Sequence, residues 1–179
     1  MRFASLALLL ALAACRPEAA DSVDLGDATE GATEAGAVEA VTLPATLVSD
    51  APTMTVYKSP TCGCCAMWVE HMEAAGFDVV TEDRDDMAAV KDSLGLPSDL
   101  SSCHTGVIDG YVVEGHVPAE HVARLLDESP EALGLAVPGM PIGSPGMEMG
   151  DRRDPYDVLV VGESGEAAVF AHVEGNTQP

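Results

Sequence analysis

The stretch TMTVYKSPTCGCCAMWVEHMEAAG, residues 53–76, predicts a strand, a short cysteine-rich loop and a helix in direct succession. Apolar and polar side chains alternate over residues 53–59, and many of them are β-branched or aromatic, which is typical of a strand. Pro60 and Gly63 favour a turn, and we predict a helix over residues 65–75. A strand that passes through a turn into a helix is the repeating unit of α/β domains, so we place the chain in that class.

Further strands and helices follow in an order that narrows the fold. In chain order we predict a strand at 77–83, a helix that begins at Asp85 or Asp86 and ends at Gly95, a hairpin at 105–115, a helix whose first residue is Pro118, and a final hairpin at 157–173. Apolar side chains recur at helical spacing in both helices, and Asp109–Gly110 suits a type I′ turn. The order βαβαββα, with an added C-terminal β-hairpin, is that of a thioredoxin-like α/β domain.

The N-terminal sequence MRFASLALLLALAAC predicts export and a lipid anchor. One arginine precedes an apolar run that is too short to span a bilayer, as in a secretory signal peptide. The stretch Leu12–Cys15 resembles the lipobox of bacterial lipoproteins, which implies cleavage after residue 14 and lipidation of Cys15. The alternative is an ordinary signal peptide that ends in a chance cysteine. Residue 16 is Arg rather than Asp, which favours the outer membrane, so we predict a periplasmic lipoprotein anchored there.

Charge and composition divide the rest of the chain into two parts. Residues 15–50 contain eight acidic residues, one arginine and no aromatic side chain, which predicts a disordered tether behind the lipidated cysteine. Residues 51–179 have the size of one domain and carry six basic against 22 acidic residues, a net charge of −16. This charge argues against nucleic acid and anionic lipid surfaces as partners. We therefore predict a signal peptide at 1–14, a tether at 15–50 and one domain at 51–179, with the membrane contacted only through the lipid.

Three cysteines within four positions, Cys62, Cys64 and Cys65, leave three interpretations open. Cys62 and Cys65 have the C-x-x-C spacing of a thiol–disulfide oxidoreductase, in which a third cysteine would invite mispairing. Structural disulfides suit an oxidising compartment, yet these cysteines lie too close together to join distant segments. A metal site uses all three, because thiolates can bridge metal ions and the start of a helix favours the thiolate. We favour the metal site and keep the redox pair as the alternative.

A fourth cysteine, Cys103, lies in SSCHTGVIDG just before the third predicted strand. In thioredoxin-like domains this segment lies against the loop that follows the first strand and usually contains a cis-proline, which is missing here. A thiolate at position 103 would point at Cys62, Cys64 and Cys65. We therefore predict that the four thiols converge on one metal site.

Other soft donors are spread over the domain. The further candidate ligands are Met67 and His71 on the first helix, His116 in EGHVP, and Met140 and Met147, with Met149, in the stretch VPGMPIGSPGMEMG at 137–150. Thioethers and imidazoles suit copper, although packing or surface exposure is the alternative for each of these side chains. We expect Met72 in the core, His104 and His121 at the surface, and His172 in the last strand.

Three stretches taken together, SPTCGCCAMWVEHM, EGHVP and GLAVPGMPIGSPGMEMG, resemble bacterial periplasmic copper-resistance proteins of the CopG type. The resemblance covers about residues 52–173 and implies a thioredoxin-like fold and a thiolate cluster of several Cu(I) ions on Cys62, Cys64, Cys65 and Cys103. It implies copper resistance by sequestration, by transfer to periplasmic efflux or chaperone proteins, or by cycling between Cu(I) and Cu(II). Zinc sites with four thiolates usually use two separated pairs, so three sulfurs on one loop also favour copper. We expect a metal-binding protein, with a thiol or copper oxidoreductase as the alternative.

Overall fold

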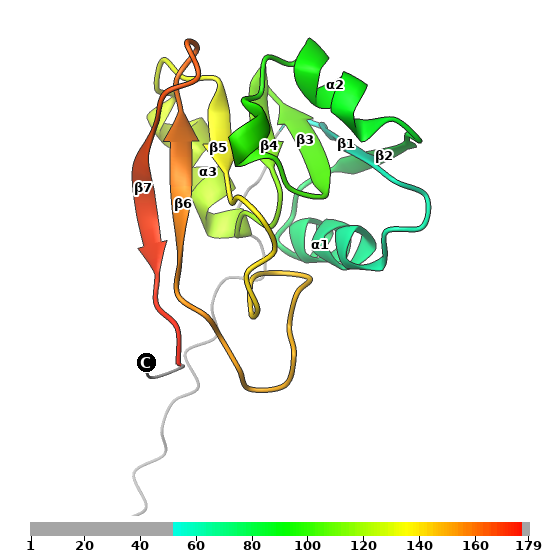
Figure 1. Cartoon of the computed structure of the whole chain (residues 1–179), viewed down its shortest axis with the longest axis vertical. Coiled ribbons are helices and arrows are strands. Elements are labelled where there is room, and N and C mark those ends of the chain that lie inside the picture. The colour runs from blue at the N-terminus through cyan, green and yellow to red at the C-terminus, as the bar shows by residue number, and fades with distance from the viewer. Residues whose placement is uncertain (1–51, 177–179) are drawn as a thin grey trace, which may run out of the picture. The chain divides into compact units, whose positions relative to one another are not determined.

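The computed structural model describes residues 52–176 as an open sheet flanked by helices (Figure 1). The strands are β1 (Met54–Lys58), β2 (Val79–Asp83), β3 (His104–Ile108), β4 (Tyr111–Glu114), β5 (Gly134–Ala136), β6 (Tyr156–Val161) and β7 (Ala167–Val173). The helices are α1 (Gly63–Ala74), α2 (Met87–Ser93) and α3 (Ala119–Glu128), with a 3₁₀ turn η1 (Ser98–Leu100). This order confirms the predicted thioredoxin-like fold with a C-terminal hairpin, β6 and β7. The predicted signal peptide at 1–14 and tether at 15–50 lie outside the described residues.

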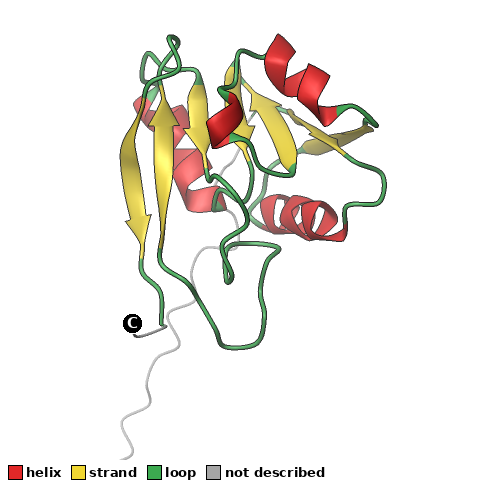
Figure 2. Cartoon of the chain, viewed as in Figure 1, coloured by secondary structure: helices red, strands yellow, loops and turns green. Residues whose placement is uncertain are grey.

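All strands of the described chain belong to one sheet, in the order β2-β1-β3-β4-β5-β6-β7 (Figure 2). β1 and β2 run parallel, as do β4 and β5, and the other neighbouring strands are antiparallel. The sequence does not predict β5, because three residues beside a Gly- and Pro-rich stretch give no periodic signal. β5 joins β4 to β6, so the C-terminal hairpin extends the main sheet.

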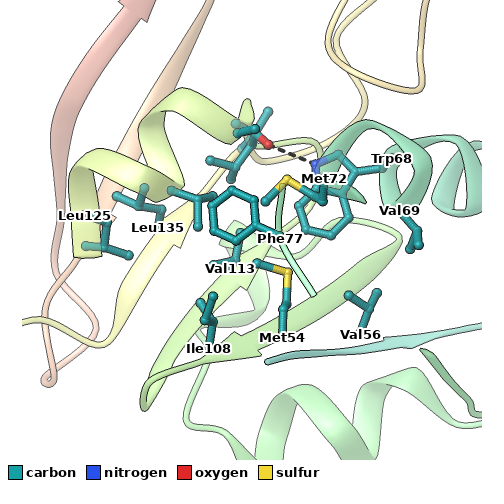
Figure 3. Close-up of a cluster of buried hydrophobic side chains, with 14 of the residues drawn as sticks. Met54, Val56, Trp68, Val69, Met72, Phe77, Ile108, Val113, Leu125 and Leu135 are labelled. Carbon is teal, nitrogen blue, oxygen red and sulfur yellow. Dashed lines mark hydrogen bonds between the residues drawn. The ribbon is translucent and has the colours of Figure 1, made fainter. Parts of the chain in front are cut away.

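The larger core lies between the sheet and the helices α1 and α3 (Figure 3). Trp68, Met72 and Phe77 are almost fully buried there, which confirms the expectation that Met72 packs in the core. The Trp68 indole N–H donates to the Val117 carbonyl at 2.8 Å, drawn as the dashed line in Figure 3. This bond ties α1 to the segment that leads into α3.

A smaller core lies on the opposite face, under α2 and η1. Val112 belongs to this core and Val113 to the larger one, as the alternation of side chains along β4 requires. Leu96 and Leu100, from the end of α2 to η1, cover this face. The sheet is therefore buried on both sides where β3 and β4 run. This burial fixes the chain segments that precede β3 and follow β4.

Local sequence signals set most of the element ends. Asp86 caps α2 by accepting a backbone N–H at 3.0 Å, as predicted. Asp109 and Gly110 have φ angles of 48° and 86°, which the predicted type I′ turn requires. Pro118 is the N-cap of α3 rather than its first helical residue, and α1 begins earlier than predicted, at Gly63. None of the helices in residues 52–176 is long and apolar enough to cross a membrane.

Candidate metal centre

The strand register brings two cysteine-bearing segments together. β1 and β3 are antiparallel neighbours, and Lys58 at the end of β1 pairs with His104 at the start of β3. The loop after β1 and the segment before β3 therefore lie side by side at the same end of the sheet. Cys62 is the N-cap residue of α1, and Cys103 directly precedes β3. Pairing between two strands thus places cysteines that are distant in the sequence next to each other.

The cysteine sulfurs of the described chain form one cluster. The Sγ atoms of Cys62, Cys64, Cys65 and Cys103 all lie within 4.8 Å of one another. Cys62 and Cys65 form a disulfide, whereas Cys64 and Cys103 are free thiols. The Cys64 sulfur is 3.5 Å from the Cys62 sulfur and 4.0 Å from the Cys103 sulfur. The four cysteines therefore converge, and the disulfide joins the two that have C-x-x-C spacing.

Cys103 carries a proton at neutral pH. Burial first, and then the neighbouring Cys64, raise the pKa of the Cys103 thiol to about 11. A metal ion that binds this sulfur must displace the proton, because the thiolate is the ligand form. Since burial disfavours an uncompensated negative charge, the thiolate becomes stable when a cation lies beside it.

Two buried imidazoles lie beside the Cys103 sulfur. His116 Nε2 is 3.1 Å and His104 Nδ1 is 3.3 Å from Cys103 Sγ. The other nitrogen of His116, Nδ1, donates its N–H to the Pro145 carbonyl at 2.7 Å, because a carbonyl oxygen can only accept. Burial lowers the pKa of His116 and lowers that of His104 well below its usual value, so both rings are neutral at pH 7.

The expectation that His104 lies at the surface is wrong. Its side chain is fully buried, because β3 lies between β1 and β4 rather than at an edge of the sheet. The His104 ring packs against Trp68, with centroids 4.4 Å apart, and meets the His116 ring edge-on at 5.0 Å. The burial of a histidine at the start of a strand cannot be predicted from the sequence, because the sequence does not show which strands are central in the sheet.

Known proteins resemble this chain closely enough to show its family. Residues 100–147 match a family model described as a protein of unknown function, DUF411. A solved structure of the copper resistance protein CopG, form 2, is 50% identical with a TM-score of 0.67, and the match covers 70% of this chain and 100% of that one. Form 1 of CopG is 51% identical with a TM-score of 0.67 over 70% of this chain and 100% of that one. The chain belongs to the CopG family. No curated protein sequence matches it.

In this CopG-family chain, residues 137–150, here called the methionine loop, contact the site through their backbone. The Pro145 carbonyl holds the His116 ring, as described above. Gly146 lies against the first turns of α1, where a Cβ atom would be 2.7 Å from the Cys64 carbonyl oxygen. Gly146 also has a φ of +82°, which favours glycine over other residues. The loop, yellow to orange in Figure 1, therefore passes beside α1 and supports the site.

The predicted methionine ligands have mostly accessible side chains. Met67 on α1 is 49% exposed, and Met140 and Met149 in the methionine loop are 52% and 62% exposed. Met147 is partly buried, and its backbone N–H donates to the Ser144 carbonyl at 2.8 Å. Ligation by Met67, Met140 or Met147 stays a prediction.

The remaining histidines of the described chain make other contacts, and metal ligation by His71 stays a prediction. His71 Nε2 accepts the Ala119 N–H at 3.1 Å, which links α1 to the start of α3 and occupies the lone pair of that nitrogen. His121 is partly buried and meets Phe170 edge-on. His172 lies in β7, as expected, and its Nδ1 is 2.7 Å from an Asp157 carboxylate oxygen.

A buried ion pair that the sequence does not predict holds the segment before Cys103. The Lys91 ammonium lies 2.5 Å from Glu114 Oε1, and both side chains are at least nine-tenths buried. The same carboxylate oxygen accepts the Ser102 backbone N–H at 2.5 Å, and Thr105 donates to Oε2 at 2.6 Å. Glu114 is the one acidic residue of the apolar strand β4, which is a weak signal, and Lys91 on α2 gives no signal at all. Ser102 precedes Cys103 and Thr105 follows it, so the Glu114 carboxylate holds the chain on both sides of Cys103.

Proposed function

We propose that this domain holds several Cu(I) ions in a thiolate cluster built on Cys62, Cys64, Cys65 and Cys103. The observation that carries the proposal is the confinement of the four sulfurs within 4.8 Å of one another. Thiolates are soft ligands that select Cu(I), and each sulfur can bridge two ions, so a compact set of four suits a multinuclear cluster. The names of the two CopG structures support copper resistance as the biological role.

The disulfide defines how the cluster would form. Four thiolates require that the bond between Cys62 and Cys65 is broken, which takes two electrons and two protons from a dithiol reductant. Cu(I) then displaces the thiol protons, including that of Cys103, whose pKa of about 11 keeps it protonated until metal binds. The bound ions are held for sequestration or passed to periplasmic copper efflux or chaperone proteins.

An anaerobic titration of the reduced protein with Cu(I), read by native mass spectrometry, tests the proposal. We expect several bound ions in the wild type and the loss of one or more in Cys103→Ser, because a hydroxyl is a poor ligand for Cu(I). X-ray absorption should show fewer copper–sulfur contacts in that variant. An unchanged ion count with unchanged copper–sulfur coordination would place Cys103 outside the site and overturn the cluster.

We further propose that the domain is tethered in the periplasm through a lipid on Cys15, with the outer membrane favoured. Cys15→Ala serves both as a test of the anchor and as a matched cysteine control. It should move the protein from the membrane fraction to the soluble fraction and leave the Cu(I) count unchanged. Wild-type protein found wholly in the soluble periplasmic fraction would end the anchor proposal.

A second candidate function is thiol–disulfide exchange, which the Cys62–Cys65 disulfide favours. Such an enzyme needs only these two cysteines, so Cys64→Ser and Cys103→Ser would keep full exchange activity toward a disulfide substrate. The copper cluster instead makes all four cysteines necessary together. The same two variants, measured in both assays, decide between the functions.

A further inference from the structure

Cys103 belongs to a second donor set, whose other two members are histidines that the thiolate cluster does not use. Cys103 Sγ, one nitrogen of His104 and one nitrogen of His116 all lie within 4.8 Å of one another. Both histidine side chains are fully buried, whereas Cys103 is partly exposed. A sulfur and two imidazole nitrogens are the donors of trigonal copper sites, and their type is distinct from an all-sulfur cluster.

His116 is oriented as a metal-binding histidine is. Its Nδ1–H is held by the Pro145 carbonyl at 2.7 Å, which leaves the lone pair of Nε2 free to face the Cys103 sulfur at 3.1 Å. Ligand histidines almost always donate their second ring N–H to a carbonyl or carboxylate in this way, because it fixes both tautomer and ring direction. A packing role alone would not require this pre-orientation toward a thiol.

The protein contacts of His104 account for only one of its two ring nitrogens. Nδ1 faces the Cys103 sulfur at 3.3 Å, whereas the buried Nε2 makes no hydrogen bond of ordinary length among the described residues, although the Gly115 backbone also interacts with the ring. An apolar aromatic ring could pack on Trp68 without leaving a buried polar atom unpaired, so the imidazole costs stability where it stands. A function for Nδ1 accounts for the choice of histidine at this position.

The three donor atoms fit around one small ion after they move slightly apart. Metal–nitrogen and metal–sulfur bonds of about 2.0–2.3 Å span donor atoms that lie slightly further apart than the 3.1 and 3.3 Å seen here. Cys103 directly precedes the start of β3 and can lean outward, since it is partly exposed. The two rings need not move, because Trp68 and the Pro145 carbonyl already hold them.

We propose that Cys103, His104 and His116 form a separate copper position, a single-ion site with one sulfur and two nitrogen donors that shares Cys103 with the thiolate cluster. The inference rests on the proposed copper function, to which it adds a position of different ligand chemistry. The shared sulfur makes this position the inner neighbour of the cluster, so a copper ion can pass between the two without leaving the protein.

The test removes the cluster and keeps the second donor set. In the full chain carrying Cys62→Ser, Cys64→Ser and Cys65→Ser, anaerobic Cu(I) titration should give one bound ion by native mass spectrometry. X-ray absorption should show one sulfur and two nitrogen neighbours. Adding His104→Phe should weaken binding at least tenfold, whereas adding the matched control His121→Phe, which removes an imidazole on α3, should leave it unchanged.

A second variant keeps the test decisive if the triple serine chain does not fold. His104→Phe in the otherwise unchanged chain should lower the ion count by one and remove copper–nitrogen scattering, with no loss of thermal stability. Binding that does not depend on His104 in either background overturns the inference. A wild type that binds only the single mixed-ligand ion would instead overturn the cluster and leave this position standing.

Discussion

Two sulfur-rich loops meet at the site, and they serve it in different ways. The cysteine loop, residues 59–65, brings its three cysteine sulfurs and that of Cys103 within 4.8 Å of one another. In the methionine loop, two of the three methionines are more than half exposed, and the site is instead contacted by the Pro145 carbonyl and Gly146. One loop therefore contributes cysteine side chains to the site, and the other contributes backbone contacts.

The difference comes from the length and composition of each loop. The cysteine loop is short, and it ends in the first turn of α1, so its side chains have little freedom. The methionine loop is long and rich in glycine and proline, and methionine side chains have three rotatable bonds, so their sulfurs are poorly fixed. A thiol with a short side chain on a rigid element is the better ligand for a preformed site.

The largest effect should come from the anchor of Cys103. Glu114→Gln leaves the Lys91 ammonium buried without its carboxylate and should lower the free energy of unfolding by about 3–5 kcal/mol. Because the Ser102 N–H loses its charged acceptor, Cu(I) affinity should fall as well. Denaturant unfolding and a competition titration with a Cu(I) chelator measure the two changes.

Glu128→Gln is the matched control for this variant. Glu128 pairs with Arg124 at 2.7 Å, but both side chains are close to half exposed. Its loss should cost less than about 1 kcal/mol and leave Cu(I) affinity unchanged. Equal destabilisation of the two variants would mean that the buried Lys91–Glu114 pair does not hold the segment before Cys103.

A moderate effect should come from the backbone of the methionine loop. Gly146→Ala and Gly150→Ala both place alanine at a positive φ, which costs about 1–2 kcal/mol. Only at Gly146 would the new methyl group also meet α1, where crowding adds roughly 1–3 kcal/mol, because nothing lies within 4 Å of a Cβ at Gly150. Thermal unfolding should therefore rank Gly146→Ala as the less stable variant.

Copper binding should follow the same ranking. Displacement of Gly146 moves the Pro145 carbonyl and frees the His116 ring, so Cu(I) uptake should weaken in Gly146→Ala and persist in Gly150→Ala. Equal uptake by the two variants would argue against backbone support as the function of the methionine loop.

The smallest effect should come from the exposed thioethers. Met140→Leu combined with Met149→Leu keeps side-chain volume and should change the free energy of unfolding by less than about 1.5 kcal/mol. Because both side chains are exposed, we expect the same Cu(I) count by native mass spectrometry as in the wild type, against the sequence-based prediction that Met140 is a ligand. A lower count would show that the methionine loop closes over the site and supplies sulfur, which would erase the contrast between the two loops.

Much of the fold could be predicted from local patterns. The alternation before the cysteine loop, the helical spacing on α2 and α3 and the Asp109–Gly110 turn each indicate a structure that neighbouring residues decide. β5 could not be predicted, because its three residues become a strand only by pairing with β4 and β6. The burial of His104 and the Lys91–Glu114 pair escaped prediction for a related reason, since both depend on which strands lie in the centre of the sheet.

The sequence by itself determined the set of candidate soft donors, the acidic charge of the domain and the order of its elements. Three thiols at the start of a helix are adjacent whatever the rest of the chain does, so their proximity needs no tertiary information. Only the tertiary structure decided that Cys103 joins them, that His104 and His116 stand behind it, and that the methionine loop holds a ring through a carbonyl. Those contacts join residues far apart in the chain, and strand register and packing across the sheet, which no local pattern encodes, bring them together.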